Sequence, residues 1–468
     1  MKTSQLTRPW LRRLGAGLAA IAAAGALTAP APAVAAQPTT KTPIQHFIFM
    51  MQGDRSFDNY FGSYPGADGI PPGVCQKTIV TGNDTACVKP FSLHGQTPPT
   101  LGAGSVEINN QYDGGRMDGF VAAYQSEGRD GTPVMGYYDR RDLPTYWDLA
   151  DNYVLFDKFF SSTRLGIGAD RSYWVSADRP PTGTNQDAVQ AAYAKQATIF
   201  DRLQAAGVDW KFYVQGYNAA VNFRTVSKSN PSSQPLRVPL LNYARFVDDP
   251  ALRSHIVDLS QYYRDLDQNT LPAVAYVASS GPSERSARSI AGGQKLVTDI
   301  VGSLMVSKSW DSSAFLLSYD GTGGWYDHVA PPQVDSNGYG LRVPALLVSA
   351  YARAGYVDST ISDYTSALAF IEQNWGLSPL AGRDKAADPL TGAFDFRQQP
   401  RAPQVQFGQP VSTDQPNRSV GIVYWCYGLA FLVVVGTLVL ASLRSRRARR
   451  SAPVQSRVNS SDPVGALK

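Results

Sequence analysis

The feature that most constrains this chain is an apolar run, AFLLSY at residues 314–319, which ends at Asp320 and a Gly-Thr-Gly-Gly turn. Such a run is typical of a buried strand in an open α/β sheet, where ligands bind at the carboxyl edge of the strands. The glycines let the backbone pass close to a bound group. Asp327 and His328 follow within eight residues of Asp320, so the sequence predicts a candidate site on this loop.

Strand-length apolar runs and segments of helical spacing alternate along the rest of the chain. The further strands are expected at 44–51, 209–214, 272–277 and 343–349, and the helices at 142–153, 198–206, 291–305 and 364–375. This alternation predicts an α/β fold with a mostly parallel central sheet and helices on both faces.

The two ends of the chain carry targeting patterns. Residues 1–36 combine a basic front, a short apolar run and small-residue cleavage patterns, which are typical of a secretory signal peptide. Residues 420–443 include no charged side chain, and this stretch is long enough for one transmembrane helix. Arginines follow it directly. We therefore expect a single-pass protein of the cell membrane with a large extracytoplasmic domain and a basic cytoplasmic tail at 444–468.

The part between these ends divides into a domain at 37–396 and a polar, proline-rich stalk at 397–419. Of the 43 basic residues, 4 precede residue 37 and 7 follow residue 443; of the 38 acidic residues, 1 follows residue 443. The external part therefore carries an acidic excess of 5, and lacks the basic surface that nucleic-acid binding requires. The expected partner is the membrane, not a nucleic acid.

Two of the three cysteines, Cys75 and Cys87, flank a polar loop in the external part. In an exported chain this arrangement is typical of a structural disulfide, because disulfides persist in oxidising compartments. We expect the two residues to be bonded.

Six stretches in one order resemble the bacterial phosphoesterase family, which holds phospholipases C and related acid phosphatases. They are IQHFIFMMQGDRSFDNYFG, GGRMDGF, MGYYDRRDLPTYWDLAD, LSYDGTGGWYDHVAPP, RVPALLVSAYARAGYVDSTISDYTSALAFIEQNWGL and DPLTGAFDF. The resemblance runs from about residue 44 to residue 396. It implies an alkaline-phosphatase-like α/β sandwich and the hydrolysis of phosphoric esters.

The family's mechanism uses a Ser or Thr nucleophile, a metal held by carboxylates, and histidines that hold the phosphate. A metal-binding Glu-Asn pair ends the first strand in the family, and here Gly53 and Asp54 stand in its place. Asp54 keeps an oxygen ligand for a cation, whereas Gly53 has none. The nucleophile position, aligned without a gap between residues 157–160 and Arg171, falls on Ile167, which has no hydroxyl.

Other reactive positions also depart from the family's pattern. Arg285 stands where a phosphate-binding His is expected. On the loop after the strand at 314–319, Asp320 remains, while Gly321 and Thr322 replace a metal-binding Glu and a phosphate-contacting His. Tyr364 stands where a further His is typical. The flanking residues are intact, so the differences are concentrated at the positions that perform the chemistry.

Three interpretations remain. The first is a membrane-anchored binding protein that has lost catalysis, in which Arg171, Arg285 and His328 bind an anion such as a phosphate-bearing lipid or envelope component. Asp54 and Asp320 would then hold a divalent cation such as Ca²⁺, although capping of the strand-end loops explains these two acids equally well.

The second interpretation is an active phosphoric-ester hydrolase with a rearranged site near Asp54, Asp320 and Thr163, in which Thr163 is the substitute nucleophile. The third is a cell-envelope interaction protein whose former pocket is filled by its own side chains. The sequence therefore leaves open whether the chain is an enzyme and which cofactor it takes.

Overall fold

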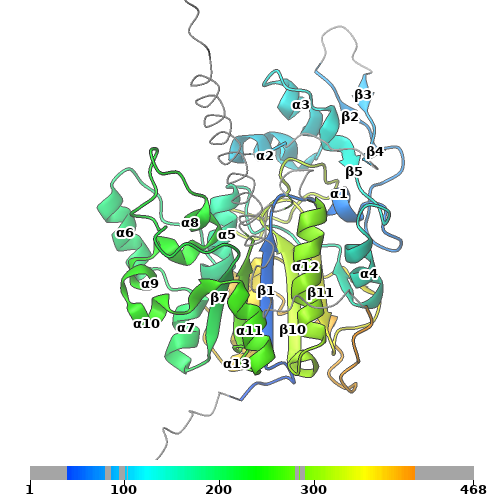
Figure 1. Cartoon of the computed structure of the whole chain (residues 1–468). Coiled ribbons are helices and arrows are strands. Elements are labelled where there is room, and N and C mark those ends of the chain that lie inside the picture. The colour runs from blue at the N-terminus through cyan, green and yellow to red at the C-terminus, as the bar shows by residue number, and fades with distance from the viewer. Residues whose placement is uncertain are drawn as a thin grey trace, which may run out of the picture. The chain divides into compact units, whose positions relative to one another are not determined.

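A computed structural model of the chain (Figure 1) describes residues 39–79, 86–93, 101–102, 104–279, 284 and 290–405. Within these ranges no helix is both long and apolar enough to cross a membrane. The expected signal peptide at 1–36, the apolar segment at 420–443, the basic tail and Arg285 all lie outside the described residues.

The centre of the fold is an eight-stranded sheet with the strand order β12-β6-β11-β10-β1-β9-β7-β8. In chain order its strands are β1 (His46–Gln52), β6 (Val154–Phe156), β7 (Trp210–Val214), β8 (Ile256–Asp258), β9 (Val274–Ala278), β10 (Ser313–Tyr319), β11 (Ala345–Ser349) and β12 (Tyr356–Asp358). Neighbouring strands are parallel except at β11, which runs antiparallel to both β10 and β6. The mostly parallel sheet that the sequence predicts is confirmed.

Side chains of β1 show how two helical layers enclose this sheet. Phe47 packs on Phe370 of α13 (Tyr364–Trp375) with ring centroids 4.9 Å apart, and Phe49 meets Trp174 of α5 (Ile167–Ser176) edge-on. On the other face, Gln52 Nε2 donates to a carbonyl of α12 (Ile290–Met305). Because strand side chains alternate between faces, α5 and α13 cover one face and α12 the other (Figure 1).

The remaining helices surround this core. They are α1 (Phe57–Phe61), α2 (Ser105–Tyr112), α3 (Phe120–Gln125), α4 (Pro144–Asn152), α6 (Gln186–Lys195), α7 (Ile199–Ala206), α8 (Gln234–Arg237), α9 (Ala244–Asp248), α10 (Pro250–Arg253), α11 (Ser260–Gln268) and α14 (Gly382–Ala386). The hydroxyl of Tyr262 in α11 donates to the carbonyl of Ile300, which places α11 beside α12.

The best-predicted helix is α13, because both of its ends carry local signals. Asp363 caps its first turn by accepting a hydrogen bond from the backbone N–H of Thr365. Gly376 ends it in the left-handed conformation, at φ +68°. The helix that the sequence predicts at 364–375 is therefore confirmed at both ends.

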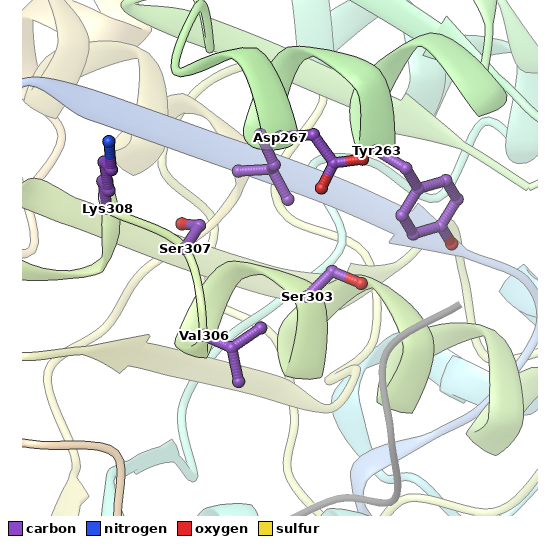
Figure 2. Close-up of a pocket in the computed structure, with 7 residues that line it drawn as sticks. Tyr263, Asp267, Ser303, Val306, Ser307 and Lys308 are labelled. Atoms are coloured by element: carbon purple, nitrogen blue, oxygen red, sulfur yellow. The ribbon is translucent and has the colours of Figure 1, made fainter. Parts of the chain in front are cut away.

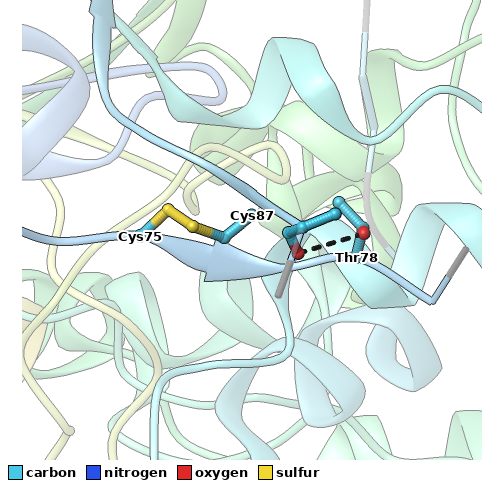
Figure 3. The surroundings of a disulfide bond; sticks show 4 residues. Cys75, Thr78 and Cys87 are labelled. Carbon is cyan, nitrogen blue, oxygen red and sulfur yellow. Dashed lines mark hydrogen bonds between the residues drawn. A yellow bond between two sulfur atoms is a disulfide. The ribbon is translucent and has the colours of Figure 1, made fainter. Parts of the chain in front are cut away.

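The segment after α1 contains three two-residue strands. They are β2 (Gln76–Lys77), β3 (Cys87–Val88) and β4 (Phe91–Ser92), of which β4 pairs with β5 (Gly136–Tyr137). A disulfide joins Cys75 to Cys87 beside the antiparallel β2–β3 pair (Figure 3), which confirms the predicted bond.

The first residues of the expected stalk lie against the domain. Trp310 Nε1 donates to the carbonyl of Arg401 at 2.8 Å, and the backbone N–H of Gln404 donates to the hydroxyl of Tyr153 at 3.0 Å. Trp310 and Tyr153 precede β10 and β6, so the described chain ends near the amino end of β10, at the edge of the sheet opposite Asp320.

Candidate functional site

The candidate site begins where β1 and β10 end side by side. The two strands are parallel, with Gln52 opposite Tyr319, and the backbone N–H of Asp320 donates to the carbonyl of Gln52 at 3.1 Å. Asp54 follows β1 in the left-handed conformation (φ +65°), which Asp tolerates better than most residues. The structure thus brings Asp54 and Asp320 to the same edge of the sheet, as the sequence predicts.

Asp320 is paired with Arg171, the first basic residue of α5. Oδ2 of Asp320 accepts a hydrogen bond from Nε of Arg171 at 2.8 Å and lies 2.7 Å from Nη2 in an ion pair, and the two side chains are 0% and 1% exposed. Nη1 of Arg171 donates to the carbonyl of Arg237 at the end of α8. A residue predicted to bind a cation and one predicted to bind an anion therefore neutralise each other.

The glycines after Asp320 allow this loop to pack closely against other residues of the chain. A Cβ on Gly323 would lie 2.5 Å from Cβ of Asp54, and a Cβ on Gly324 would lie 1.8 Å from the hydroxyl of Tyr124. Gly321 has φ +139°, a conformation that side chains rarely adopt. At this position the backbone therefore disfavours the Glu that the family's pattern contains.

The nucleophile position lies at the start of α5. Ile167 is its first residue, follows Gly166 at φ +95°, and is partly exposed. The helix N-terminus would stabilise an anion at this place, but the side chain there is aliphatic.

The hydroxyls near Ile167 in sequence are buried and already bonded. Thr163 is 1% exposed, and its Oγ1 accepts from the backbone N–H of Leu165 at 3.2 Å. The hydroxyl of Ser162, fully buried, donates to Oδ2 of Asp363 at 2.7 Å. The proposed substitute nucleophile is thus held inside the protein.

Two further acids lie near this site, Asp170 and Asp363, and neither was predicted to be a site residue. Burial raises the pKa of Asp170 well above its ordinary value, and the charge of Asp320 raises it further against the lowering effect of a hydrogen bond from the Thr163 N–H. Burial also raises the pKa of Asp363. A raised pKa disfavours the ionised form of an acid, and so disfavours the charge that would attract a cation. The signal for Asp170 is that it stands where the family's pattern has an Asn, but nothing local in the sequence indicates its burial.

His328 lies in a different network. Its Nδ1 is 2.7 Å from Oδ2 of Asp58, and its Nε2 is 3.2 Å from Oδ1 of Asp68. Arg342 pairs with Asp58 at 3.1 Å and with Asp327 at 2.9 Å. His328 therefore contacts acids, and no described contact joins it to Arg171.

The same network contains a group with the spacing of metal ligands. Within the parts of the chain that the structure describes, the potential ligand atoms of Asp58, Asp327 and His328 lie within 4.8 Å of one another. The guanidinium of Arg342 already provides a positive charge to both acids, and backbone N–H groups of Asp58, His328 and Val329 occupy further carboxylate lone pairs. The carboxylates of Asp58 and Asp327 are thus occupied by partners within an internal ion-pair network.

A buried acid next to the Arg285 position was also missed. Glu284 accepts hydrogen bonds from the hydroxyls of Tyr60, Tyr146 and Tyr319, and burial raises its pKa. Arg55 donates to Tyr60 at 3.0 Å. The four aromatic and acidic groups are far apart in sequence, so only the fold brings them together.

A separate cleft of about 270 Å³ lies between α11 and α12 (Figure 2). It is lined by Tyr263, Leu266, Asp267, Ser303, Val306, Ser307 and Lys308, none of which belongs to the predicted site. The Oγ of Ser303 is buried without a hydrogen-bond partner. Because α12 leads into the start of β10, this cleft lies toward the amino ends of the strands, away from Asp320.

Comparisons with known proteins agree with the resemblance in the sequence. The model of the phosphoesterase family matches residues 44–378. Phospholipase C A of Mycobacterium tuberculosis is 29% identical over 428 residues, which cover 79% of this chain and 81% of that protein. Hemolytic phospholipase C of Pseudomonas aeruginosa is 27% identical over 443 residues, with coverage of 78% and 58%.

Solved structures are more distantly similar. A protein of the alkaline phosphatase superfamily from Vibrio parahaemolyticus covers 75% of this chain and 71% of its own, at 11% identity and a TM-score of 0.36. The PsFucS1 sulfatase from Pseudoalteromonas covers 72% and 69%, at 10% identity and a TM-score of 0.38. The strand order of this chain establishes the α/β fold. The alkaline-phosphatase-like class is an expectation that comes from the resemblance in the sequence.

Proposed function

Because the chain belongs to the phosphoesterase family, we propose that it is a membrane-anchored, extracytoplasmic member that acts by binding and has lost the family's metal-assisted hydrolysis. The ligand class that the family suggests is a phosphate-bearing lipid or envelope component. Relatives of this chain are phospholipases C by name, and the apolar segment at 420–443 would hold the domain at a membrane.

The observation that carries the proposal is the buried pair of Arg171 and Asp320. In the family's mechanism, a carboxylate at the position of Asp320 must face a metal ion. Here its Oδ2 accepts a hydrogen bond from Nε of the Arg171 guanidinium and forms an ion pair with Nη2, and both side chains are almost fully buried. Separating a buried ion pair costs about 3–5 kcal/mol, so a metal ion would have to displace a strong internal partner.

The identity of the residue at the start of α5 supports the same conclusion. Ile167 offers no nucleophilic atom, and loss of the nucleophile from a catalytic set lowers turnover by about 10⁶-fold. The hydroxyls of Ser162 and Thr163 are buried and bonded to other groups. Neither can reach a substrate without a rearrangement of the loop that precedes α5.

The alternative is a phosphoric-ester hydrolase with a rearranged site near Asp54, Asp320 and Thr163. One contact favours a hydroxyl nucleophile in this region, since the hydroxyl of Ser162 donates to the buried carboxyl of Asp363. A base that accepts the proton of a hydroxyl is the arrangement that activates a serine. This alternative requires Ser162 or Thr163 to become exposed when substrate binds.

The proposal is tested by assaying the purified full-length chain in detergent. p-Nitrophenyl phosphate and p-nitrophenyl phosphorylcholine would be offered with Ca²⁺, Mg²⁺, Mn²⁺ or Zn²⁺, in parallel with the variants Asp320→Asn and Ser162→Ala. We expect the wild-type rate to equal the rates of both variants at every metal. A wild-type rate that falls in Asp320→Asn or Ser162→Ala would establish catalysis at this edge and overturn the proposal.

Binding and anchorage are measured separately. Calorimetry of the full-length chain with phosphorylcholine and with inorganic phosphate measures binding of the anion. Anchorage predicts that the chain stays with membranes in alkaline carbonate and is released by detergent, whereas a chain truncated after residue 405 is released without detergent. Release of the full chain by carbonate would show that the chain is not anchored in the membrane and would overturn that part of the proposal.

A further inference from the structure

The imidazole of His328 stands between two carboxylates from different parts of the chain. Nδ1 lies 2.7 Å from Asp58, in α1, and Nε2 lies 3.2 Å from Asp68, in the loop that follows α1. His328 is 13% exposed and Asp68 is 44% exposed. The ring therefore connects a buried acid of α1, Asp58, to an acid that solvent can reach, Asp68.

The protonation state of the ring decides how many of these contacts are favourable. An imidazolium ion donates from both nitrogens, whereas a neutral imidazole donates from one and presents a lone pair at the other. With both carboxylates ionised, the protonated ring bonds to Asp58 and Asp68 together. The neutral ring keeps one bond and turns a lone pair toward the other carboxylate, which is repulsive.

The charged groups around the ring come from four segments. Asp58 belongs to α1, Asp68 to the following loop, Asp327 is the neighbour of His328, and Arg342 precedes β11, with Nη2 3.2 Å from Nδ1 of the ring. Burial lowers the pKa of His328, but the contact with Asp58 and the charges of Asp58 and Asp327 raise it by more, against the lowering effect of Arg342.

The backbone of Asp68 is held independently of this contact. Its N–H donates to Oδ2 of Asp157 at 2.9 Å, and its carbonyl accepts from Nη1 of Arg342 at 2.8 Å. Loss of the His328 contact would therefore loosen the residues beyond Asp68, toward the disulfide of Cys75, without detaching the loop at its root.

We propose that the contact between His328 and Asp68, here called the clasp, holds the loop after α1 to the loop after β10 and depends on the protonation of the His328 ring. The clasp is closed when the ring is protonated and opens when it loses its proton. It goes beyond the proposed function, because it makes the surroundings of the site respond to external pH whether or not the chain hydrolyses a substrate.

The pH window follows from the sign of the shift. The pKa of His328 is raised above 6.5, so the contact is fully present below that pH and is lost as the pH rises through the raised value. Burial raises the pKa of Asp327 to about 6, against the lowering effect of Arg342. Between pH 6.5 and pH 8.5, therefore, the protonation of His328 changes and that of Asp327 contributes less.

Hydrogen exchange of the full-length chain tests the clasp at residues 69–79, after correction for the intrinsic effect of pH. We expect exchange there to be about threefold to fivefold faster at pH 8.5 than at pH 6.5, the scale of a half-exposed ion pair. In Asp68→Asn, which keeps the shape of the side chain and lies partly in solvent, the two pH values should give equal exchange.

A matched control is Asp148→Asn, which removes an exposed acid that pairs with Arg140 and should leave the wild-type pH response unchanged. NMR titration of the His328 ring supplies a second readout, in which Asp68→Asn should move the midpoint to lower pH. Equal responses of the wild type and Asp68→Asn in exchange, or an unmoved midpoint, would overturn the clasp.

Discussion

The guanidinium of Arg171 meets a single oxygen, Oδ2 of Asp320, across 149 residues of sequence, with a hydrogen bond from Nε at 2.8 Å and an ion-pair contact from Nη2 at 2.7 Å. This pair joins the start of α5 to the end of β10 at the edge of the sheet where the family's chemistry takes place. Both side chains are almost fully buried, so the contact is screened little by salt.

The first prediction concerns the stability that this pair provides. Arg171→Met removes the guanidinium that pairs with the buried carboxylate of Asp320, so we expect the free energy of unfolding to fall by about 3–5 kcal/mol. The double variant Arg171→Met with Asp320→Leu removes both charges and should recover most of this loss. Urea denaturation of the three proteins measures it, and a single variant as stable as the wild type would contradict the pairing.

The second prediction concerns metal ions. Asp320 is engaged by Arg171, and burial raises the pKa of Asp170 and of Asp363, which disfavours their charged forms, so this edge offers less charge to a cation. We expect Ca²⁺, Mg²⁺, Mn²⁺ or Zn²⁺, and removal of metal by EDTA, to change the melting temperature by less than about 1 °C, since only a bound ligand stabilises the fold. A concentration-dependent rise that disappears in Asp320→Asn would show a metal site at this edge.

Much of the fold is predictable from the sequence because its signals are local. The apolar run of β10, the capping Asp363 and the terminating Gly376 each lie within the element that they define. The direction of β11 is not predictable in this way, because a strand that is buried on both faces has the same composition whether it runs parallel or antiparallel.

The arrangement of the site is less predictable, because its partners are distant in sequence. Arg171 and His328 were expected to bind an anion together. The fold instead pairs Arg171 with Asp320 and places His328 between Asp58 and Asp68. The glycines after Asp320 were expected to approach a ligand, and they approach Asp54 and Tyr124. Which group a glycine or an arginine faces is decided by packing, and residue type alone does not indicate it.

The third prediction concerns restoration of the family's side chains. Gly321 has φ +139°, so Gly321→Glu places a side chain in a conformation that costs about 1–3 kcal/mol. Thr322→His, at the next position, has no such conformational cost and is the matched control. Thermal denaturation should show a lower melting temperature for Gly321→Glu only, and equal melting of both variants would mean that the loop relaxes freely.

The fourth prediction concerns two acids that share one backbone donor at the opposite side of the domain. The N–H of Leu380 donates to Oε1 of Glu372 at 3.2 Å and to Oδ2 of Asp384 at 2.6 Å. Burial, followed by the hydrogen bond with Asp384 and its charge, raises the pKa of Glu372 to about 9. Glu372 is therefore protonated in the folded chain at neutral pH, whereas in the unfolded chain it ionises near its ordinary value of 4.5.

A carboxyl group whose pKa is raised by folding stabilises the fold fully below its unfolded value, and this stability is lost as the pH rises toward the folded value. The free energy of unfolding should therefore fall between pH 4.5 and about 9, by up to about 1.4 kcal/mol for each pH unit. Glu372→Gln keeps the shape without a titrating group and should flatten this profile, while Glu127→Gln, at a surface pair with Arg129, should not. Melting temperatures of the three full-length proteins across this range measure the effect, and parallel profiles for the wild type and Glu372→Gln would show that Glu372 is ionised in the folded chain.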